Sequence, residues 1–440
     1  MQTTKNSRRR PAAALAAGVG VTLVLSACGG SGSGGGSESG GSADTISFWL
    51  SSSDAQAKGY QDLAADFEAE TGTAVEITNV PYDGYSTKLR QSAQADALPD
   101  AATVPALDPI WTGALQDLAD VAEDPANQID DKYVVTAEDG ANAGRVLAIP
   151  SDVTASGLFI NKTLFDQAGV AYPTDPEQTW TWDEFTAAAS QVREATGAKY
   201  DLTFDASPSR LRAFVYEHGG DYMQQAEDGS FTTNDETVAA LEDFVAMNDD
   251  VVMPKSVWTS GADANALFKS GQVVGYWSGV WQVADFADSI TGFEWASVPA
   301  PAQPVHASDV NAGGIVVAFD NDDARAAAAK QFVEFMYEPE NYSKLVATNG
   351  FLPVETGLDP DYAFDSPAAS EAFDLYLQEI ELADPISTYF YRAQIEWNLA
   401  GKGLTADPSA DEMAKAINGE QDVQTAVDNI IAGYDQQVGG

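Results

Sequence analysis

Short apolar strands alternate with amphipathic helices over residues 45–118, and this alternation limits the folds open to the chain. Buried strands are predicted at residues 45–50, 74–78 and 101–104. The first intervening helix is expected to end at Gly72, the second covers residues 81–89, and a third helix is expected near 110–118. Because a βαβαβ order places strands side by side with right-handed crossovers, a parallel sheet is expected.

The strand and helix pattern restarts after residue 145. Apolar runs at 146–149 and 157–160 are predicted strands on either side of a loop over 150–156. Thr181 and Glu184 have capping-box spacing and predict a helix that runs toward Gly197. Further helices are predicted at residues 211–217, 235–247 and 262–270, and further strands at 202–204, 272–277 and 314–319. A chain of 440 residues exceeds what one core usually holds, so an α/β protein with two sheets and two lobes is expected.

Composition excludes several classes of function. The chain has 22 Lys and Arg against 67 Asp and Glu, a formal charge of −45, which argues against nucleic acid and against an anionic bilayer surface. Cys28 is the single cysteine, and His218 and His306 are the two histidines, so no disulfide, no Cys- or His-based metal site and no cofactor is expected. No phosphate-binding G-x-x-x-x-G-K-[ST] loop is present, so the chain does not hydrolyse ATP itself.

The first 28 residues have the character of an export signal. Residues 1–27 contain four basic residues and no acid, and the apolar run over 12–25 is too short to span a membrane, which takes about 20 residues. The run ends in Leu-Ser-Ala-Cys-Gly, which resembles the bacterial lipobox, in which cleavage precedes an acylated cysteine. The alternative is an ordinary signal peptide with a chance cysteine.

Cleavage before Cys28 would remove four basic residues and no acid, and would leave 413 residues with a charge of −49. Acyl chains on Cys28 would hold the protein at the outer face of the cytoplasmic membrane, with no other membrane contact. Residues 29–44 are almost all Gly and Ser and predict a flexible tether with a reach of about 20–24 Å.

Five motifs in order resemble those of bacterial extracellular solute-binding proteins of ABC importers. They are Ala97–Asp100 with Trp111 and Gly113–Leu118, Phe159–Gly169, Thr179–Phe185, Phe268–Trp281, and Asn311–Gly314 with Ala326–Pro339. The match is nearest to the carbohydrate-binding branch, which includes the maltose-binding proteins. Ile160 replaces the family's usual tyrosine before Asn161, and Gly275 replaces its usual methionine.

This resemblance implies a type II periplasmic-binding-protein fold, in which each of two hinge-joined lobes is a mostly parallel sheet flanked by helices. It places lobe 1 at residues 45–150 plus 305–355 and lobe 2 at 151–304 plus 356–440. It further implies a non-enzymatic monomer that closes on a small-molecule sugar and docks on permease subunits served by a separate cytoplasmic ATPase.

Candidate ligand contacts come from loops at the carboxyl ends of strands, where α/β folds bind ligands. Aromatic rings suit the C–H faces of a sugar and polar groups suit its hydroxyls. The predicted ligand-binding residues are Trp49, Ser51, Asp108, Asp152, Thr154, Arg210, Trp277, Trp281, Gly313, Gly314, Tyr389 and Arg392. By the resemblance, Trp281 aligns with the family's sugar-stacking tryptophan.

Structural alternatives stay open for several of these residues. Trp277 lies in a predicted strand and fits the core at least as well as a site. Asp108 before Pro109 is a good helix N-cap, and Arg210 could belong to a surface ion pair. Gly313 and Gly314 allow either close backbone approach or only a tight turn.

Two other functions compete with sugar import as readings of the sequence. The same importer role with a polyamine or an organic anion stays open, because local charges outweigh distant ones that salt screens. A secreted glycosidase would need two suitably spaced carboxylates, a signal without specificity among 67 acids, and there is no G-x-S-x-G nucleophile motif.

Overall fold

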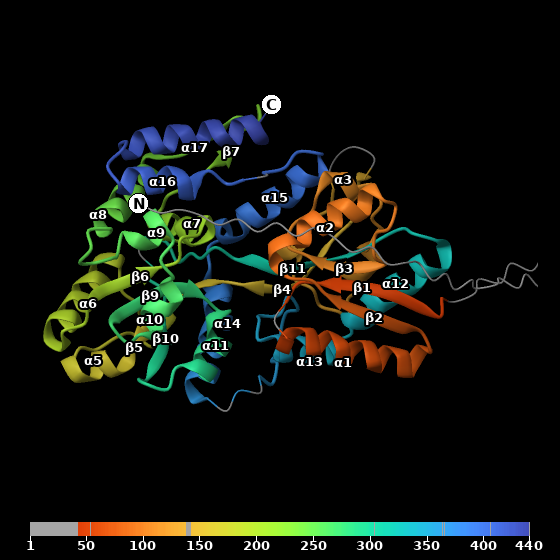
Figure 1. Ribbon diagram of the computed structural model, residues 1–440, viewed down its shortest axis with the longest axis horizontal. Coiled ribbons are helices and arrows are strands. Elements are labelled where there is room, and N and C mark those ends of the chain that lie inside the picture. The colour runs from red at the N-terminus through yellow and green to blue at the C-terminus, as the bar shows by residue number, and fades with distance from the viewer. Residues whose placement is uncertain are drawn as a thin grey trace, which may run out of the picture. The chain divides into compact units, whose positions relative to one another are not determined.

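The structure is a computed structural model that describes residues 43–52, 54–137, 142–302, 304–362, 364, 366–404 and 406–439. The predicted signal peptide, Cys28 and all but the last two residues of the predicted tether lie outside these residues. Residues 41–440 form one compact unit. Within it, two sheets with separate sets of helices define the two lobes named below (Figure 1).

The first lobe is built on a five-stranded sheet of order β2-β1-β3-β11-β4. Its strands are β1 (Thr45–Leu50), β2 (Ala74–Asn79), β3 (Ala101–Val104), β4 (Ile149–Thr154) and β11 (Asn311–Ala318). Strand β1 pairs in parallel with β2 and β3, as predicted, whereas β11 is antiparallel to both β3 and β4. The predicted loop over 150–156 is wrong, because residues 150–154 continue β4 in register with β11.

The second lobe is built on a four-stranded sheet of order β10-β5-β9-β6. Its strands are β5 (Ser156–Asn161), β6 (Tyr200–Phe204), β9 (Val273–Gly279) and β10 (Trp295–Val298). The β6–β9 pair is parallel, whereas β5–β9 and β10–β5 are antiparallel. This sheet is therefore mixed, and the prediction of a mostly parallel sheet is wrong for it. A separate small hairpin joins β7 (Gln224–Gln225) to β8 (Phe231–Thr232).

Helices cover both sheets. On the first lobe they are α1 (Asp54–Thr71), α2 (Tyr82–Gln94), α3 (Pro109–Thr112), α4 (Ala119–Ala122), α12 (Asp323–Met336) and α13 (Pro339–Asn349). On the second lobe they are α5 (Lys162–Ala168), α6 (Trp182–Thr196), α7 (Pro208–Glu217), α8 (Asp235–Met247), α9 (Ser256–Ser260), α10 (Ala264–Lys269), α11 (Gln282–Ser289) and α14 (Pro367–Leu382). Helices α15 (Tyr389–Leu399), α16 (Ser409–Ile417) and α17 (Val423–Gln437) complete the chain, with 3₁₀ turns at Asp131–Tyr133, Pro176–Gln178 and Pro385–Thr388.

Local capping explains why several helix ends match the sequence predictions. Thr181 and Glu184 form the predicted capping box, and Gly197 ends the same helix in the left-handed conformation at φ 79°. Helix α3 is the exception, because it stops after one turn at Gly113 instead of continuing toward residue 118.

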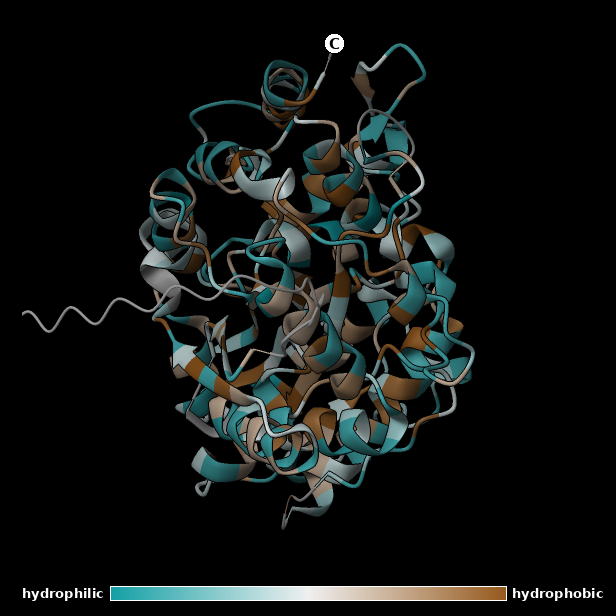
Figure 2. Ribbon diagram, turned by 90° about the vertical axis from the view of Figure 1, so that its right-hand side faces the viewer, coloured by the Kyte–Doolittle hydropathy of each residue, from teal (hydrophilic) through white to brown (hydrophobic). Residues whose placement is uncertain are grey.

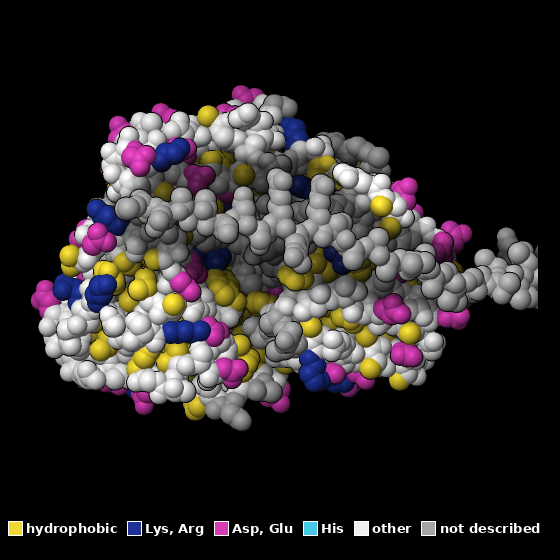
Figure 3. Space-filling model, in the orientation of Figure 1, with side chains coloured by type: hydrophobic (Ala, Val, Ile, Leu, Met, Phe, Trp, Pro, Cys, Tyr) yellow, Lys and Arg dark blue, Asp and Glu magenta, His cyan; other side chains and the backbone are white. Residues whose placement is uncertain are grey.

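The hydrophobic core is nearly continuous. Helix turns alternate between hydrophobic and hydrophilic residues in Figure 2, which matches their one-sided burial. One cluster of buried apolar residues extends through both sheets, and a second cluster lies between the first sheet and helices α2, α3 and α15. Figure 3 shows acidic side chains spread over the visible face, in keeping with the charge of −45.

The two sheets meet where the chain crosses between the lobes. Strand β4 belongs to the first sheet, and after Ala155 the chain continues directly as β5 of the second. Strand β11 returns beside β4 with irregular register around Gly314, and Leu352 pairs with Val153 as a third strand-like contact. Residues 149–161 therefore form a continuous link between the lobes.

Candidate functional site

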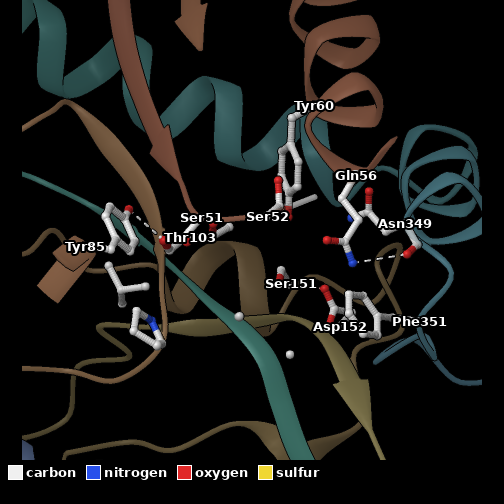
Figure 4. A pocket seen from close by; sticks show the side chains of 14 residues that line it. Ser51, Ser52, Gln56, Tyr60, Tyr85, Thr103, Ser151, Asp152, Asn349 and Phe351 are labelled. Carbon is white, nitrogen blue, oxygen red and sulfur yellow. Dashed lines mark hydrogen bonds between the residues drawn. The ribbon is translucent and has the colours of Figure 1, made fainter. Parts of the chain in front are cut away.

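A pocket of about 90 Å³ lies at the carboxyl ends of β1 and β3, next to strands β4 and β11 (Figure 4). This is the edge at which open α/β sheets bind ligands. The lining residues are Ser51, Ser52, Gln56, Tyr60, Tyr85, Thr103, Val104, Pro105, Ser151, Asp152, Gly313, Gly314, Asn349 and Phe351. We call it the lobe-1 pocket.

Asp152 is a buried carboxylate in the wall of the lobe-1 pocket. Its side chain is 3% exposed, and its Oδ2 accepts a hydrogen bond from the Ser151 hydroxyl at 2.9 Å. Its Oδ1 has no hydrogen-bond partner among the described residues. Burial raises the pKa of Asp152 to about 7, although the Ser151 hydroxyl and the main chain at Gly313 favour the charged form. A buried oxygen without a partner is costly, so this atom is suited to accept a hydrogen bond from a ligand.

Asn349 places a second such oxygen in the same wall. It is the last residue of α13, just before Gly350 ends the helix in the left-handed conformation at φ 69°. Its side-chain Oδ1 is buried without a partner among the described residues, while its main-chain oxygen accepts a hydrogen bond from Gln56 Nε2 at 3.3 Å. In Figure 4, Asp152 lies beside Phe351, and Asn349 lies next to Gln56.

Aromatic side chains form the apolar part of the pocket. Tyr60 stacks on Phe48 with ring centroids 5.4 Å apart, and burial raises the pKa of Tyr60, which therefore stays protonated and able to donate. The Tyr85 hydroxyl already donates to the Thr103 main-chain oxygen at 2.8 Å, so that residue offers the pocket only its ring. Acceptors, hydroxyls and aromatic surface together match the demands of a polyol.

Gly313 lets the backbone of β11 approach Asp152. A Cβ added at residue 313 would lie 1.8 Å from Asp152 Oδ1 and 3.0 Å from its Cγ. Close approach, rather than a tight turn alone, is therefore what this glycine provides.

We expect Gly313→Ala to weaken ligand binding, because the new methyl group displaces the Asp152 carboxylate. Overpacking of this kind costs about 1–3 kcal/mol, which is enough to lower affinity several-fold or more. Calorimetric titration of the variant tests this. Gly113→Ala is the matched control, since a Cβ at residue 113 meets nothing within 4 Å. Equal affinity of Gly313→Ala and wild type would contradict the assignment.

Trp281 and Arg210 form a pair in the second lobe. Trp281 caps α11, and the edge of its ring fills the space that a Cβ at Gly279 would occupy. Arg210 Cζ lies 4.2 Å from the centroid of that ring, and Arg210 Nε donates to the Ser156 hydroxyl at 3.0 Å. Ser156 follows Asp152 by four residues, about 13 Å along an extended chain. The pair lies outside the lobe-1 pocket, farther along the link between the lobes.

Two other predicted contacts, Trp277 and Asp108, have structural roles. Trp277 is fully buried between Trp182 and Phe204, and its indole donates to the Arg210 main-chain oxygen at 3.2 Å, so it is a core residue with no surface for a ligand. Asp108 caps α3 through the Ile110 amide and pairs with Arg90. All residues of β9 are buried, which leaves Trp277 in the core, and the N-cap hydrogen bond of α3 occupies the carboxylate of Asp108.

Four more residues have structural contacts of their own. Trp49 lies under the Lys88 ammonium at 4.1 Å, and the Thr154 hydroxyl lies 3.3 Å from the Asn311 main-chain oxygen. The Tyr389 hydroxyl accepts from the Gln225 amide at 2.9 Å. Arg392 donates to the main-chain oxygens of residues 131, 132 and 134. Whether any of these four contacts a ligand stays a prediction.

Sequence reasoning selected Ser51, Asp152, Gly313 and Gly314 of the pocket but missed most of its wall. The sequence patterns indicate no ligand contact at Gln56, Tyr60, Tyr85 or Asn349. The one available signal was Asn349 before Gly350, a helix C-terminus, which by itself does not indicate a ligand. Among the described residues, no group of three or more His, Cys, Asp or Glu is placed to hold a metal ion.

The profile of the bacterial extracellular solute-binding protein family matches residues 62–372, and the chain belongs to this family. A binding protein of Brucella abortus, whose name specifies no ligand, is 23% identical over 373 residues, covering 81% of this chain and 88% of that protein. The diacetylchitobiose-binding protein DasA of Streptomyces coelicolor is 22% identical over 367 residues, covering 80% of this chain and 84% of DasA.

Solved structures show the same two-lobe fold. The ABC substrate-binding protein of Listeria monocytogenes in complex with cycloalternan superposes with a TM-score of 0.68 at 22% identity, covering 89% of this chain and 98% of that chain. The predicted α/β two-lobe architecture is confirmed by this likeness. Over the described ranges from residue 43 to 439, no helix combines the length and apolar character needed to cross a membrane.

Proposed function

We propose that this protein captures a sugar, a mono- or oligosaccharide, between its lobes and delivers it to the permease of an ABC importer. The observation that carries the proposal is the unpartnered Oδ1 of Asp152, buried in a pocket with aromatic walls. A sugar hydroxyl would satisfy that oxygen, and Asn349 Oδ1 offers a second acceptor nearby.

The names of similar proteins support a sugar rather than another solute. DasA is named for diacetylchitobiose, and the Listeria protein was solved with cycloalternan. These names belong to proteins that share under a quarter of their residues with this chain, so the particular sugar is a matter for experiment.

The position of the pocket supports coupling of binding to lobe closure. Ser151, Asp152, Gly313 and Gly314 all lie on β4 and β11, the strands next to the crossing between the lobes. A rotation of the lobes would move these residues relative to the second lobe. A ligand that contacts both lobes would favour the closed state by its difference in affinity for the two states.

The membrane tether and the transport partner rest on the sequence. Acylation of Cys28 would hold the protein at the outer face of the membrane, and residues 29–44 would let it turn toward the permease. A separate cytoplasmic ATPase would supply the energy.

Binding without turnover is the second half of the proposal. Hydrolysis of a glycosidic bond needs a pair of carboxyl groups, and among the described residues that line the lobe-1 pocket Asp152 is the one acid. The family and its named relatives are binding proteins, which favours the same conclusion.

A thermal-shift screen of the purified protein tests the function. The panel contains mono- and oligosaccharides, with polyamines, amino acids and organic anions as controls. A ligand at 100 times its dissociation constant stabilises by about 2.7 kcal/mol, which is a measurable rise in melting temperature. Stabilisation by a sugar that is not consumed supports the proposal. Stabilisation by polyamines or non-sugar anions alone would keep the importer role and overturn the sugar.

We expect Trp281→Ala to weaken sugar binding by about 1–3 kcal/mol, the scale of losing an aromatic contact in a binding site. Trp281→Phe keeps a ring and should lose less. Calorimetric titration gives the affinities, and circular dichroism checks the fold. Unchanged affinity of a folded Trp281→Ala variant would remove Trp281 from the site.

A further inference from the structure

Arg210 is a buried cation without an ion-pair partner. It is 8% exposed, and among the described residues no carboxylate oxygen lies within 4.0 Å of its guanidinium. Arg212, two residues farther along α7, is paired with both Asp309 and Asp407. Since burying an unpaired charge is costly, the difference between these two arginines needs an explanation.

The nearest acids already have other partners. Asp205 accepts hydrogen bonds from the hydroxyls of Tyr276 and Ser278, at 2.5 and 2.6 Å. Asp309 accepts from Arg212 and from Asn311 Nδ2. Burial lowers the pKa of Arg210, while Asp309 and Asp205 act against that shift from beyond contact distance.

The contacts of Arg210 leave most of its donors unused. A guanidinium has five N–H groups in one plane, and the one on Nε is taken by Ser156. Among the described residues, the four on the terminal nitrogens have no side-chain or main-chain acceptor. Arg210 Cζ lies over the Trp281 ring, and this contact with the ring takes up none of the N–H groups as a hydrogen-bond donor.

We propose that the sugar bound by this protein carries a carboxylate. Arg210, held by Trp281 and Ser156, binds that carboxylate in a bidentate manner, through two parallel N–H···O hydrogen bonds. The ligand class is therefore a uronic acid or an oligosaccharide that contains one. Arginine and carboxylate match in geometry as well as charge, and such charge-assisted bonds are about twice as strong as neutral ones. The negative net charge does not oppose this at short range, because salt screens charges beyond about 8–10 Å.

This inference rests on the proposed function and narrows it. Asp152 and Asn349 in the first lobe would take hydroxyls, and Arg210 in the second would take the acid group. A saccharide that bridges the two would also favour closure.

The test compares matched sugars that differ in the oxidation of C6. The probes are digalacturonate with galactobiose, dimannuronate with mannobiose, and cellobiouronate with cellobiose, each titrated calorimetrically into the purified full-length protein. We expect at least one uronate to bind ten-fold or more tightly than its neutral counterpart. Arg210→Gln should reduce that ratio to near one, a loss of about 10- to 100-fold. Arg210→Lys keeps the positive charge but lacks the planar pair of N–H donors, and it should keep only part of the preference for the uronate.

Arg90→Gln is the matched control, since it removes the same charge from a half-exposed surface pair with Asp108. It should leave the preference unchanged. Neutral sugars that bind as well as the uronates would overturn this inference and leave the proposed function intact. A uronate preference that survives in Arg210→Gln and Arg210→Lys would also overturn it. Binding of none of the sugars would count against both proposals.

Discussion

Replacing Asp152 with asparagine should weaken sugar binding about 10- to 100-fold, the scale of one hydrogen bond to a charged group. The reason is the Oδ1 atom, which is buried in the lobe-1 pocket with no partner among the described residues. Asparagine keeps the shape and one acceptor but loses the charge. Calorimetric titration with the sugar that stabilises the wild-type protein most gives the change in affinity.

The same substitution should make the unliganded protein more stable at and above pH 7. Burial raises the pKa of Asp152 from an ordinary 3.8 to about 7. Between these values the folded protein holds a proton that the unfolded chain has released, so the free energy of unfolding falls as pH rises through this window. Above pH 7, ionisation of the buried Asp152 lowers the free energy of unfolding by about 4 kcal/mol in all, because one pKa unit corresponds to about 1.4 kcal/mol. Asparagine cannot ionise and avoids this cost.

Chemical unfolding of both proteins from pH 4 to pH 8 checks the sign. The stability of Asp152→Asn minus that of wild type should grow with pH across this range. Asp62→Asn is the control, because Asp62 is largely exposed in an ion pair with Lys58. A stability difference between Asp152→Asn and wild type that does not change with pH would show that Asp152 does not titrate in this range.

Unchanged sugar affinity of Asp152→Asn in the calorimetric titration would remove Asp152 from the binding site.

Replacing Arg212 with methionine should lower the free energy of unfolding by about 3–5 kcal/mol, the cost of breaking a buried ion pair on one side. Arg212 Nη2 lies 3.2 Å from Asp309 Oδ2, and Nη1 lies 3.3 Å from Asp407 Oδ2. Its Cζ lies 3.5 Å from the centroid of the Phe390 ring. The substitution would leave the fully buried Asp309 without a cation.

Arg212 also connects distant parts of the chain. Asp309 lies just before β11, and Asp407 accepts a hydrogen bond from Tyr434 on α17. Urea unfolding of Arg212→Met measures the effect. The double variant with Asp309→Asn should recover part of the loss, because no buried charge then remains unpaired at Asp309. Lys58→Met, in an exposed pair, should change stability by about 0.5 kcal/mol or less. A similarly small effect for Arg212→Met would contradict this account.

Local signals in the sequence predicted much of the secondary structure. Helix α8 spans residues 235–247 as predicted, and the capping box of Thr181 and Glu184 starts α6. These features depend on residues within a few positions of each other, which a linear pattern records. The family was identified in the same way, from motifs in a fixed order, and the profile match confirms it.

The arrangement of the site depends on contacts that no local pattern records. Asp152 and Asn349 lie almost two hundred residues apart in sequence. They line one pocket only because β4 pairs with β11 in the first sheet and α13 packs against α1. Trp277 and Trp281 are four residues apart, yet one is a core residue and the other faces Arg210. The class of protein and most of its helices and strands can be predicted from the order of the residues alone. Contacts between distant parts of the chain decide the direction of the strands, whether each tryptophan lies in the core, and which polar atoms stay without partners. The reason is that burial and hydrogen bonding are properties of the assembled chain.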